Sequence, residues 1–343
     1  MPSLDIFNTD AFSLTSLTDA INKRPFQPGR LGQLGIFQGR GITTTTLYVE
    51  EKSGVLSLVQ TSARGAAGGT VGSHMRTARP FRVPHLQQNG TVVADEVQNV
   101  RAFGEENVTQ TIQELTNERN GEMQDNILVT QEFHRMGAVQ GLVLDADGST
   151  LFNLFTEFGV AQQTLDIALA TATTKVRNRI VAAKRLAEAE LGGVTISGWR
   201  GFCGANYFDA LVDHATVIEA YKYQQGQVLG TDLREAGFNY AGVAWEEYRG
   251  SVGPQAGGAA VDFINTDQAR LVPIVPGMYV TRFAPADYEE TVNTLGLPFY
   301  ARQAPDPSGF NKFRALEVQS NPISLCLRPR AVIKLTKSEG EFA

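Results

Sequence analysis

Apolar residues recur every three or four positions along residues 105–137, the spacing that places them on one face of a helix. The stripe runs through Val108, Ile112, Leu115, Met123, Ile127, Val129, Phe133 and Met136. A helix of about thirty residues spans roughly 45 Å at ~1.5 Å per residue, which is longer than a small compact domain requires. We therefore predict one long helix that acts as a strut.

A second helical pattern covers residues 165–187, and the glycine pair 192–193 that follows it is typical of a helix C-terminus. Further along, Asn206 is followed three positions later by Asp209, which favours an N-cap at Asn206. The residues behind this cap predict helical stretches that continue through Tyr223.

Between the N-terminus and the long helix, residues 42–60 are rich in β-branched and aromatic side chains and predict strand structure. Residues 64–73 are glycine-rich, and an extended segment returns at residues 81–86, where Pro84 favours a sheet edge. The pattern predicts a long two-stranded ribbon. Because an isolated ribbon is at best marginally stable, we expect it to lack an adequate hydrophobic partner in its own polypeptide and to lie on another copy.

The clearest hairpin lies at residues 141–152, where two apolar strands are joined by an Asp-Gly turn. Short apolar runs predict further strands at 194–203, 238–245, 315–318, 324–327 and 331–335. Helices and strands are mixed without a regular βαβ alternation, which favours an α+β fold over a doubly wound sheet.

The chain of 343 residues contains 36 acidic and 30 basic residues, a formal net charge of −6. This charge argues against non-specific attraction of the whole chain to DNA or to an anionic membrane. The N-terminus lacks the basic start and apolar stretch of a signal peptide, and no run approaches the ~18 apolar residues required to span a bilayer. These features favour a soluble intracellular product.

Charge is unevenly distributed between the ribbon and the long helix. No acidic residue lies between Glu51 and Asp95, whereas acidic residues crowd the N-terminal end of the helix, where the helix dipole favours them. The opposite signs indicate that the ribbon of one copy pairs with the helix of a neighbouring copy. The candidate interface residues are Arg64, Arg76, Arg79 and Arg82 on the ribbon, and Glu105, Glu106, Glu114 and Glu118 on the helix.

Candidate catalytic and metal-binding motifs are weak. Residues 65–73 could form a phosphate cradle, but neither a Gly-Lys-Ser/Thr sequence nor a helix follows, so a loop tip is the better interpretation. Residues 145–148 depart from the calcium-loop pattern and fit a hairpin turn better. The four histidines are scattered, and Cys203 and Cys326 lie in apolar stretches typical of inert buried thiols. We expect no catalytic residue, no metal site and no cofactor; an enzyme that uses the glycine-rich loop stays open as an alternative.

Four segments stand out in order along the chain: residues 91–104, 238–250 with Glu246-Glu247-Tyr248-Arg249-Gly250, 283–288 and 291–298 with Phe283-Ala284-Pro285, and 319–322 with 328–329, which contain Gln319-Ser320-Asn321-Pro322. Together they resemble the corresponding segments of the lambda-type E family of tailed-phage major capsid proteins. The resemblance covers nearly the whole chain from about residue 40. It implies the capsid shell fold, in which copies form the hexamers and pentamers of an icosahedral head around double-stranded DNA. An encapsulin-like protein compartment is the alternative within the same fold.

The resemblance also implies a domain organisation. It divides the chain into an N-terminal arm at 1–40, an extended loop at 41–100, a peripheral domain with the spine helix and the hairpin at 101–160, an axial domain at 161–312, and C-terminal strands at 313–343 that return to the peripheral domain. Four glycines at the loop tip would act as a hinge when the shell expands: Gly65, Gly68, Gly69 and Gly72.

The partners implied by the resemblance are other copies of the chain, a scaffolding protein, a portal and the packaged DNA. A decoration protein is left open. The expected location is the virion, after assembly in the host cytoplasm. We expect a lattice without covalent links between subunits, without a cofactor and without a membrane partner.

Overall fold

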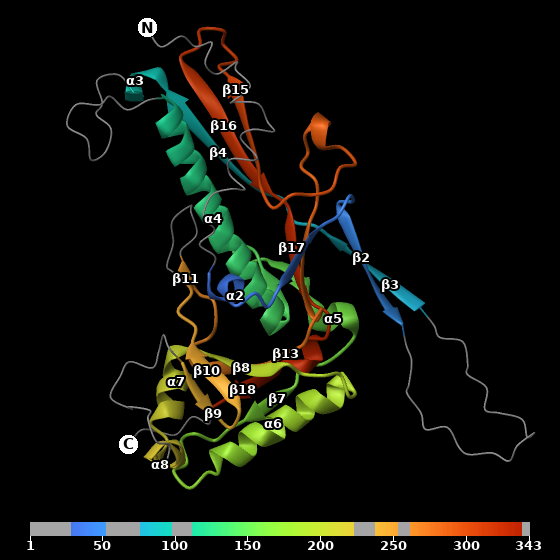
Figure 1. The fold of residues 1–343 in the computed structure, drawn as a ribbon, viewed down its shortest axis with the longest axis vertical. Helices are drawn as coiled ribbons and strands as arrows, with labels where there is room; N and C mark the ends of the chain where they lie inside the picture. The colour runs from blue at the N-terminus through green and yellow to red at the C-terminus, as the bar shows by residue number, and fades with distance from the viewer. Residues whose placement is uncertain (1–28, 53–75, 98–111, 223–236, 253–260, 338–343) are drawn as a thin grey trace, which may run out of the picture.

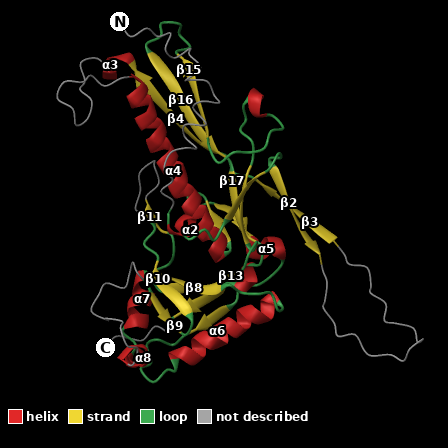
Figure 2. Cartoon of the chain, in the orientation of Figure 1, coloured by secondary structure: helices red, strands yellow, loops and turns green. Residues whose placement is uncertain are grey.

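The computed structural model describes residues 29–52, 76–97, 112–222, 237–252 and 261–337. These residues form three connected regions along one axis, with a two-stranded ribbon that projects to one side (Figure 1). The long helix α4 (Ile112–Gln140) runs from the first region into the second, and a six-stranded sheet organises the third. Each region contains both helix and strand (Figure 2), which confirms the predicted α+β class.

The long-helix region consists of the first turns of α4 and a three-stranded antiparallel sheet. The order in this sheet is β15 (Tyr300–Pro305), β16 (Phe313–Ser320) and β4 (Leu86–Val93), and the short helix α3 (Ala94–Val97) follows β4. An apolar cluster joins the sheet to α4: Val92, Met123, Ile127, Leu128, Phe299, Ala301, Leu316 and Val318. The polar residues Thr116, Asn120 and Gln124 lie beside this cluster along α4 and are buried too.

The central region surrounds the C-terminal half of α4. Strand β1 (Gln38–Gly41) pairs in parallel with β14 (Tyr279–Phe283), and β14 pairs antiparallel with β17 (Pro322–Cys326). Around this sheet lie α2 (Arg30–Gln33), the hairpin β5 (Leu142–Leu144) and β6 (Thr150–Asn153), α5 (Leu154–Phe158), the pair β11 (Ser251–Val252) and β12 (Val261–Asp262), and the short helix η4 (Pro329–Ala331). The short helix η3 (Glu289–Thr291) lies instead beside the long-helix region, where Glu290 pairs with Arg302 of β15. The ribbon β2 (Thr46–Lys52) and β3 (Arg76–Arg82) leaves from this region.

The third region, the six-stranded sheet region, has the strand order β7 (Thr164–Asp166), β18 (Ile333–Thr336), β13 (Gln268–Ile274), β8 (Gly198–Cys203), β10 (Val243–Glu247) and β9 (Phe238–Tyr240). Helices α6 (Val176–Leu191), α7 (Ala205–Val212) and α8 (Ala215–Lys222) pack against it. Neighbouring residues of β8 point to opposite faces, so Cys203 joins the core under α6 and α7 while Phe202 joins the core of the central region. The sheet is therefore buried on both sides.

Trp245 is the largest fully buried side chain of this sheet. Its indole Nε1 donates a hydrogen bond to the carbonyl oxygen of Tyr240, at 3.1 Å. The ring lies against the backbone of Gly201, where an added Cβ would come within 2.1 Å of Trp245 Cε3. Glycine is required at position 201 because the neighbouring strand carries a tryptophan on the same face.

The two predicted helices have different outcomes. The long helix is confirmed over Ile112–Gln140 and extends three residues beyond the predicted end; residues 105–111 lie outside the described residues. The second prediction is wrong in its first half, because residues 164–166 pair in parallel with β18 and Ala168 has a φ of 56°. Helix α6 begins at Val176 and ends, as predicted, at a left-handed Gly192.

The predicted N-cap at Asn206 is also wrong. Gly204 occupies the N-cap position of α7, and the Asn206 side chain donates instead to Asp267 Oδ1, at 3.0 Å. Helical stretches follow as expected, in α7 and α8, up to Lys222.

Most predicted strands are confirmed, with different bounds. The 141–152 hairpin is β5–β6, residues 238–245 form the antiparallel pair β9–β10, and the C-terminal runs lie in β16, β17 and β18. The prediction of one edge strand over residues 81–86 is wrong. Strand β3 ends at Arg82 and β4 begins at Leu86, and Pro84 lies between the two strands. β4 itself does lie at a sheet edge.

Candidate interaction surfaces

The base of the β2–β3 ribbon is anchored in its own chain. On the face that meets the body, Leu47 and Val49 pack on the central core and Phe81 is 1% exposed. The ring of Phe81 lies 5.8 Å from that of Phe152 and 5.9 Å from that of Phe158, centroid to centroid. The expectation that the ribbon lacks a hydrophobic partner in its own polypeptide is therefore wrong for its base.

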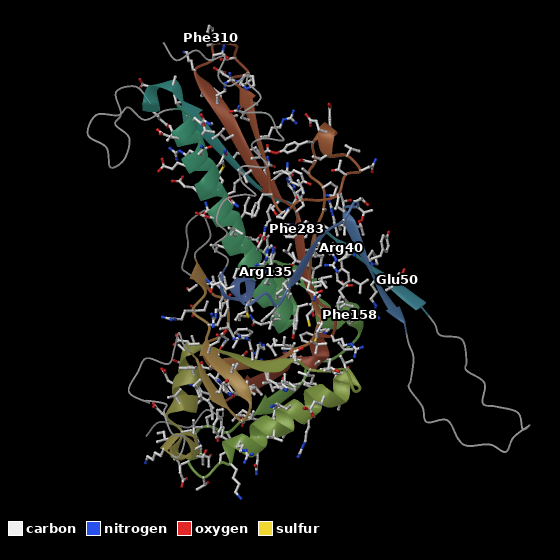
Figure 3. The ribbon with its side chains drawn as sticks, in the orientation of Figure 1. Arg40, Glu50, Arg135, Phe158, Phe283 and Phe310 are labelled. Carbon is white, nitrogen blue, oxygen red and sulfur yellow. The ribbon has the colours of Figure 1, made fainter. Side chains whose placement is uncertain are left out.

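The opposite face of the ribbon is open to solvent. Tyr48 is 63% exposed and sits opposite Pro80 in the register, and Glu50, Ala78 and Arg82 are exposed beside them. Figure 3 shows Glu50 on the projecting part of the ribbon, away from the body. Tyr48 was not among the candidate residues, although the alternation through Thr46–Val49 places it opposite to Leu47 and Val49.

The four candidate arginines have different environments. Arg79 lies on the inner face, with its Cζ 5.6 Å from the centroid of the Phe158 ring, so it contributes to anchoring the ribbon on its own chain. Arg82 is exposed, and Arg76 lies in β3 opposite Lys52. Arg64 and the four candidate hinge glycines, Gly65, Gly68, Gly69 and Gly72, lie outside the described residues.

The acidic candidates lie on a separate part of the molecule. Glu114 and Glu118 are exposed near the start of α4, while Glu105 and Glu106 lie outside the described residues. Arg119 is 3.8 Å from both Glu96 and Glu122, which balances part of the negative charge locally. The beginning of α4 and the ribbon project from opposite sides of the chain (Figure 1), so one copy does not bring the two sets of residues together.

A turn at the far end of the β15–β16 hairpin carries Phe310, which is 76% exposed (Figure 3). The carboxylate of Asp306 holds this turn by accepting hydrogen bonds from Ser308 N, Ser308 Oγ and Lys312 N, at 2.8, 2.6 and 3.1 Å. An exposed aromatic residue on an ordered turn is typical of a contact residue. In the sequence, Phe310 is the aromatic residue of a Pro-Ser-Gly-Phe-Asn turn. It was not predicted as an interface residue, because the prediction used charge alone.

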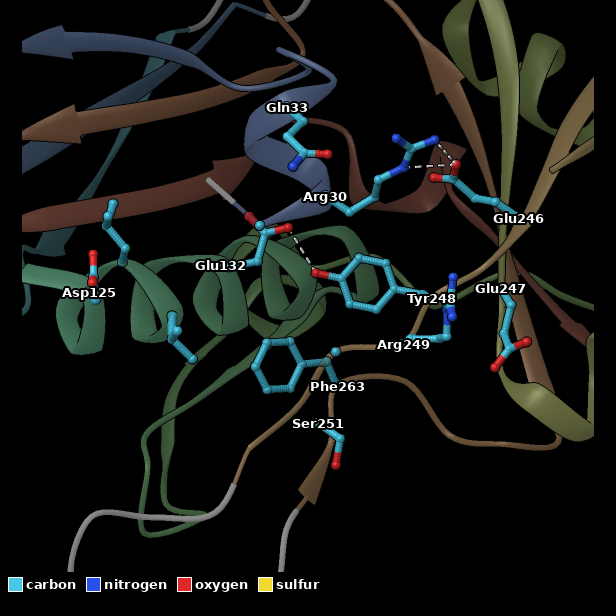
Figure 4. A pocket seen from close by; sticks show the side chains of 14 residues that line it. Arg30, Gln33, Asp125, Glu132, Glu246, Glu247, Tyr248, Arg249, Ser251 and Phe263 are labelled. Carbon is cyan, nitrogen blue, oxygen red and sulfur yellow. Dashed lines mark hydrogen bonds and ion pairs between the residues drawn. The ribbon is translucent and has the colours of Figure 1, made fainter. Parts of the chain in front are cut away.

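A pocket of about 580 Å³ opens where α2, α4 and the segment after β10 meet (Figure 4). Its walls carry six charged side chains: Arg30, Asp125, Glu132, Glu246, Glu247 and Arg249. Figure 4 shows Tyr248 pointing at Glu132, and Arg30 pointing at Glu246. None of these residues was predicted as functional, because their partners are far apart in the sequence.

The environment of the two cysteines fits the inert thiols expected from the sequence. Both are fully buried, and burial raises the pKa of Cys326 to about 12 and that of Cys203 well above its usual value. The described ranges contain no group of three or more His, Cys, Asp or Glu side chains placed to hold a metal ion. Among the helices of the described residues, none is both long and apolar enough to cross a lipid bilayer.

The sequence model of the phage major capsid protein E family matches residues 13–337 of this chain. The chain belongs to that family. The major capsid protein of Pseudomonas phage KPP10 is 29% identical over 341 residues, which cover 94% of this chain and 96% of that protein. The major capsid protein of Salmonella phage Felix O1 is 23% identical over 357 residues, with 94% and 95% coverage. The resemblance found from the sequence motifs is thereby confirmed.

The fold is also shared with solved phage capsid structures. The capsid protein of cyanophage P-SCSP1u superposes with a TM-score of 0.54 over 89% of this chain and 87% of that one, at 11% sequence identity. The two chains therefore share a fold although few of their residues are identical. The predicted capsid shell fold is confirmed. Members of a capsid protein family act as structural subunits that associate with copies of themselves, and their location is the virion.

Proposed function

We propose that this chain is the subunit of a phage head, in which copies arranged as hexamers and pentamers close an icosahedral shell around double-stranded DNA. The observation that carries the proposal is the match to the phage major capsid protein E family over residues 13–337. No catalytic activity is part of this function. We propose further that assembly takes place in the host cytoplasm with a separate scaffolding protein and a portal, without covalent links between subunits; a decoration protein on the outside stays open.

The geometry of the single chain supports assembly through exchange of surfaces between copies. The ribbon presents an exposed face with Tyr48 and Arg82, and the start of α4 presents Glu114 and Glu118 elsewhere on the molecule. Because one copy keeps these surfaces apart, a ribbon that pairs with α4 must use the α4 of another copy. Repeated around a ring, such a contact joins each subunit to the next in the same direction.

The domain division at 1–40, 41–100, 101–160, 161–312 and 313–343 is part of the proposal. Two stretches contribute strands beyond their own segment: β4 of the extended loop pairs with β16 of the C-terminal strands, and β15 of the axial segment pairs on the other side of β16. The sheet beside the spine helix therefore draws on three separate segments. The hinge role of the glycines at 65–72 likewise stays a proposal.

Reversing the charges on the ribbon and at the start of α4 tests the proposed contact between them. In the variant Arg76→Glu with Arg82→Glu, we expect the subunit to fold and closed particles to be lost, as seen by negative-stain electron microscopy. Arg79 is left unchanged because it packs on Phe158 of its own chain. Adding Glu114→Arg and Glu118→Arg should restore particles, because the attraction returns with reversed signs.

The reverse variant, Glu114→Arg with Glu118→Arg alone, is the matched control and should also lose particles. Normal particles from either charge-reversed variant would contradict the electrostatic pairing. Loss of particles in the fourfold variant, with both partial variants folded, would contradict the pairing of these particular surfaces. Failure of the unaltered protein to form closed shells under any assembly condition would contradict the proposed function itself.

A further inference from the structure

The carboxylate of Glu132 is buried at the junction of three separate segments (Figure 4). Glu132 is 3% exposed and lies in α4. Its Oε1 accepts hydrogen bonds from the amide of Leu31, at 2.5 Å, and from the hydroxyl of Tyr248, at 2.8 Å. Its Oε2 accepts from the amide of Gly32, at 3.3 Å, and from Arg135 Nη1, at 3.4 Å. Both oxygens are thus used by two donors each.

The donors come from parts of the chain that are far apart in sequence. Leu31 precedes Glu132 by 101 positions, and Tyr248 follows it by 116 positions. Residues 29–33, which we name the arm root, are the first described residues of the chain. One carboxylate therefore connects the arm root, the spine helix and the segment that leaves β10.

A second ion pair strengthens the same junction. Arg30 of the arm root donates from Nε and Nη2 to Glu246 Oε2, at 3.0 and 2.5 Å, and Arg200 Nη1 lies 3.6 Å from the same oxygen. Leu31, the next residue along the arm root, is 0% exposed and belongs to the central core. The arm root is consequently fixed by one apolar anchor and by two buried acids.

The geometry also shows that the fit around Glu132 is tight. A Cβ added at Gly29 would lie 2.4 Å from Glu132 Cγ and 2.6 Å from its Cδ. The backbone of Gly29 has a φ of −58°, which other residues adopt freely, so glycine is required there for space and not for conformation. Any larger residue must displace a carboxylate that four donors hold in place.

A buried carboxylate is unfavourable unless its oxygens are satisfied, and removing it leaves its donors unsatisfied in turn. Tyr248 remains a donor over the accessible pH range, because burial first and the neighbouring Glu132 second raise the pKa of its hydroxyl. Arm root, spine helix and the Tyr248 segment therefore keep their relative positions only while all members of the set are present.

We propose that Glu132 is a positioning residue for assembly: it holds the arm root on the spine helix and on the Tyr248 segment, and assembly requires this arrangement of the subunit. The assembly part of this inference rests on the proposed function. The positioning part concerns a single copy and can be measured without assembly.

The first experiment measures amide hydrogen exchange by mass spectrometry on the full-length unassembled chain. In Glu132→Gln the amide keeps the shape of the side chain, but in either orientation its NH₂ group faces a backbone N–H, that of Leu31 or that of Gly32, which requires an acceptor. We expect peptides that contain Leu31 and Gly32 to exchange at least tenfold faster, with unchanged exchange in the six-stranded sheet. The matched control is Glu122→Gln, an exposed glutamate of the same helix whose ion pair with Arg119 is 3.8 Å long.

A second variant reaches the same junction by a different route. Gly29→Ala keeps every charge and displaces Glu132 by steric contact, so it should increase exchange in the same peptides. Tyr248→Phe removes one donor and should give a smaller increase. Unchanged exchange at Leu31 and Gly32 in both Glu132→Gln and Gly29→Ala would overturn the positioning role. An equal increase throughout the chain would also overturn it, since Glu132 would then serve general stability.

Particle yield by electron microscopy then tests the assembly part. We expect Glu132→Gln and Gly29→Ala to give fewer or misshapen particles while Glu122→Gln matches the unaltered protein. Local acceleration of exchange together with normal particles would overturn the assembly role of Glu132 and leave the proposed function intact. Loss of particles in the Glu122→Gln control as well would also overturn the assembly role of Glu132, because the loss of particles would then not be specific to the junction.

Discussion

The six-stranded sheet region and the long-helix region differ in the size and polarity of the core that each one buries. In the described residues, the core between the six-stranded sheet and its helices α6 and α7 contains nineteen buried apolar residues, with aromatic rings from Tyr207, Phe208, Phe238, Tyr240 and Trp245. The cluster between α4 and the sheet β15–β16–β4 contains eight. The N-terminal part of α4 therefore rests on a small apolar patch, while its C-terminal part packs in the central core.

The long-helix region supplements its small core with buried polar residues. Thr116, Asn120 and Gln124 lie on α4 beside the apolar cluster, and Gln131 Nε2 donates to Ser320 Oγ at 3.0 Å. The outward face of the same sheet is exposed at Gln87, Asn89 and Thr91. A polar interface gains less from the removal of water than an apolar one does. The six-stranded sheet region therefore has a large apolar core of its own, and we expect the long-helix region to depend more on surfaces supplied by neighbouring subunits.

The largest effect is expected from the apolar core of the six-stranded sheet region. Trp245→Ala removes a fully buried indole that hydrogen-bonds to Tyr240 and covers Gly201. We expect a loss of about 3–5 kcal/mol in the free energy of unfolding, measured by urea denaturation. A loss below about 1 kcal/mol would show that this core collapses around the cavity and is not tightly packed, which would weaken the contrast between the regions.

The next largest effect is expected from the pH dependence of α4, at a histidine in the part of the helix that the central region surrounds. His134 of α4 is 3% exposed, and burial lowers its pKa to about 4, against the smaller opposing influence of Asp145. In the unfolded chain a histidine titrates near 6.5, so between about pH 6.5 and pH 4 the unfolded state binds the additional proton. Stability is therefore fully present above about pH 6.5 and falls as the pH decreases towards 4, by on the order of 3 kcal/mol from this residue.

Replacement of the histidine tests this sign. In His134→Gln the free energy of unfolding should decrease less steeply between pH 6.5 and pH 4. The difference in slope between the two proteins should correspond to the uptake of about one proton on unfolding. The comparison is made by urea denaturation at several pH values with both proteins. Parallel curves for the two proteins would show that groups other than His134 cause the acid dependence of stability.

A substitution among the buried polar residues of α4 should change the free energy of unfolding only slightly, and in the direction opposite to Trp245→Ala. Asn120 is 4% exposed, and its Oδ1 accepts no hydrogen bond from the described residues. In Asn120→Leu an unsatisfied acceptor is replaced by apolar surface of similar size, so we expect unchanged stability or a gain of about 1 kcal/mol. A loss of more than about 2 kcal/mol would show that the polar residues of α4 are required for folding of the isolated subunit.

The smallest effect on the subunit is expected at the exposed tip. Phe310 is 76% exposed, and Lys312 Nζ lies 5.6 Å from the centroid of its ring. Phe310→Ser should change the free energy of unfolding by no more than about 0.5 kcal/mol, as is usual for surface positions. Particle yield should nevertheless decrease if the tip contacts a neighbour. A stability loss comparable to that of Trp245→Ala would remove the distinction between surface and core that the comparison rests on.

The parts of the fold that follow from local periodicity could be predicted from the sequence. The spacing of apolar residues identified α4, the Asp-Gly turn identified the β5–β6 hairpin, and the glycine after α6 marked its end. The predictions were wrong where distant residues decide local structure. Leu165 continues a helical stripe in sequence, but its backbone pairs with β18, about 170 positions later.

The candidate interaction surfaces could be predicted only in part, for a related reason. Net charge along the sequence distinguished the ribbon from the start of α4, yet it could not show that Arg79 turns inward to Phe158 while Arg82 is exposed. The junction at Glu132 left no signal in the sequence, since its donors at Leu31 and Tyr248 come from segments that only the folded chain brings together. Val129, part of the predicted apolar stripe, is 38% exposed, so periodicity overestimated the buried face of α4.

The central claim is that the ribbon and the long-helix region are completed by neighbouring subunits, whereas the six-stranded sheet region is complete in one chain. The most direct measurement compares amide hydrogen exchange of the same protein as unassembled subunits and as closed particles. The account predicts that peptides from β2, β3 and the first turns of α4 exchange at least tenfold more slowly in particles, while core peptides from β8 and β13 are unchanged. Equal exchange of the ribbon and of α4 in the two states would contradict it.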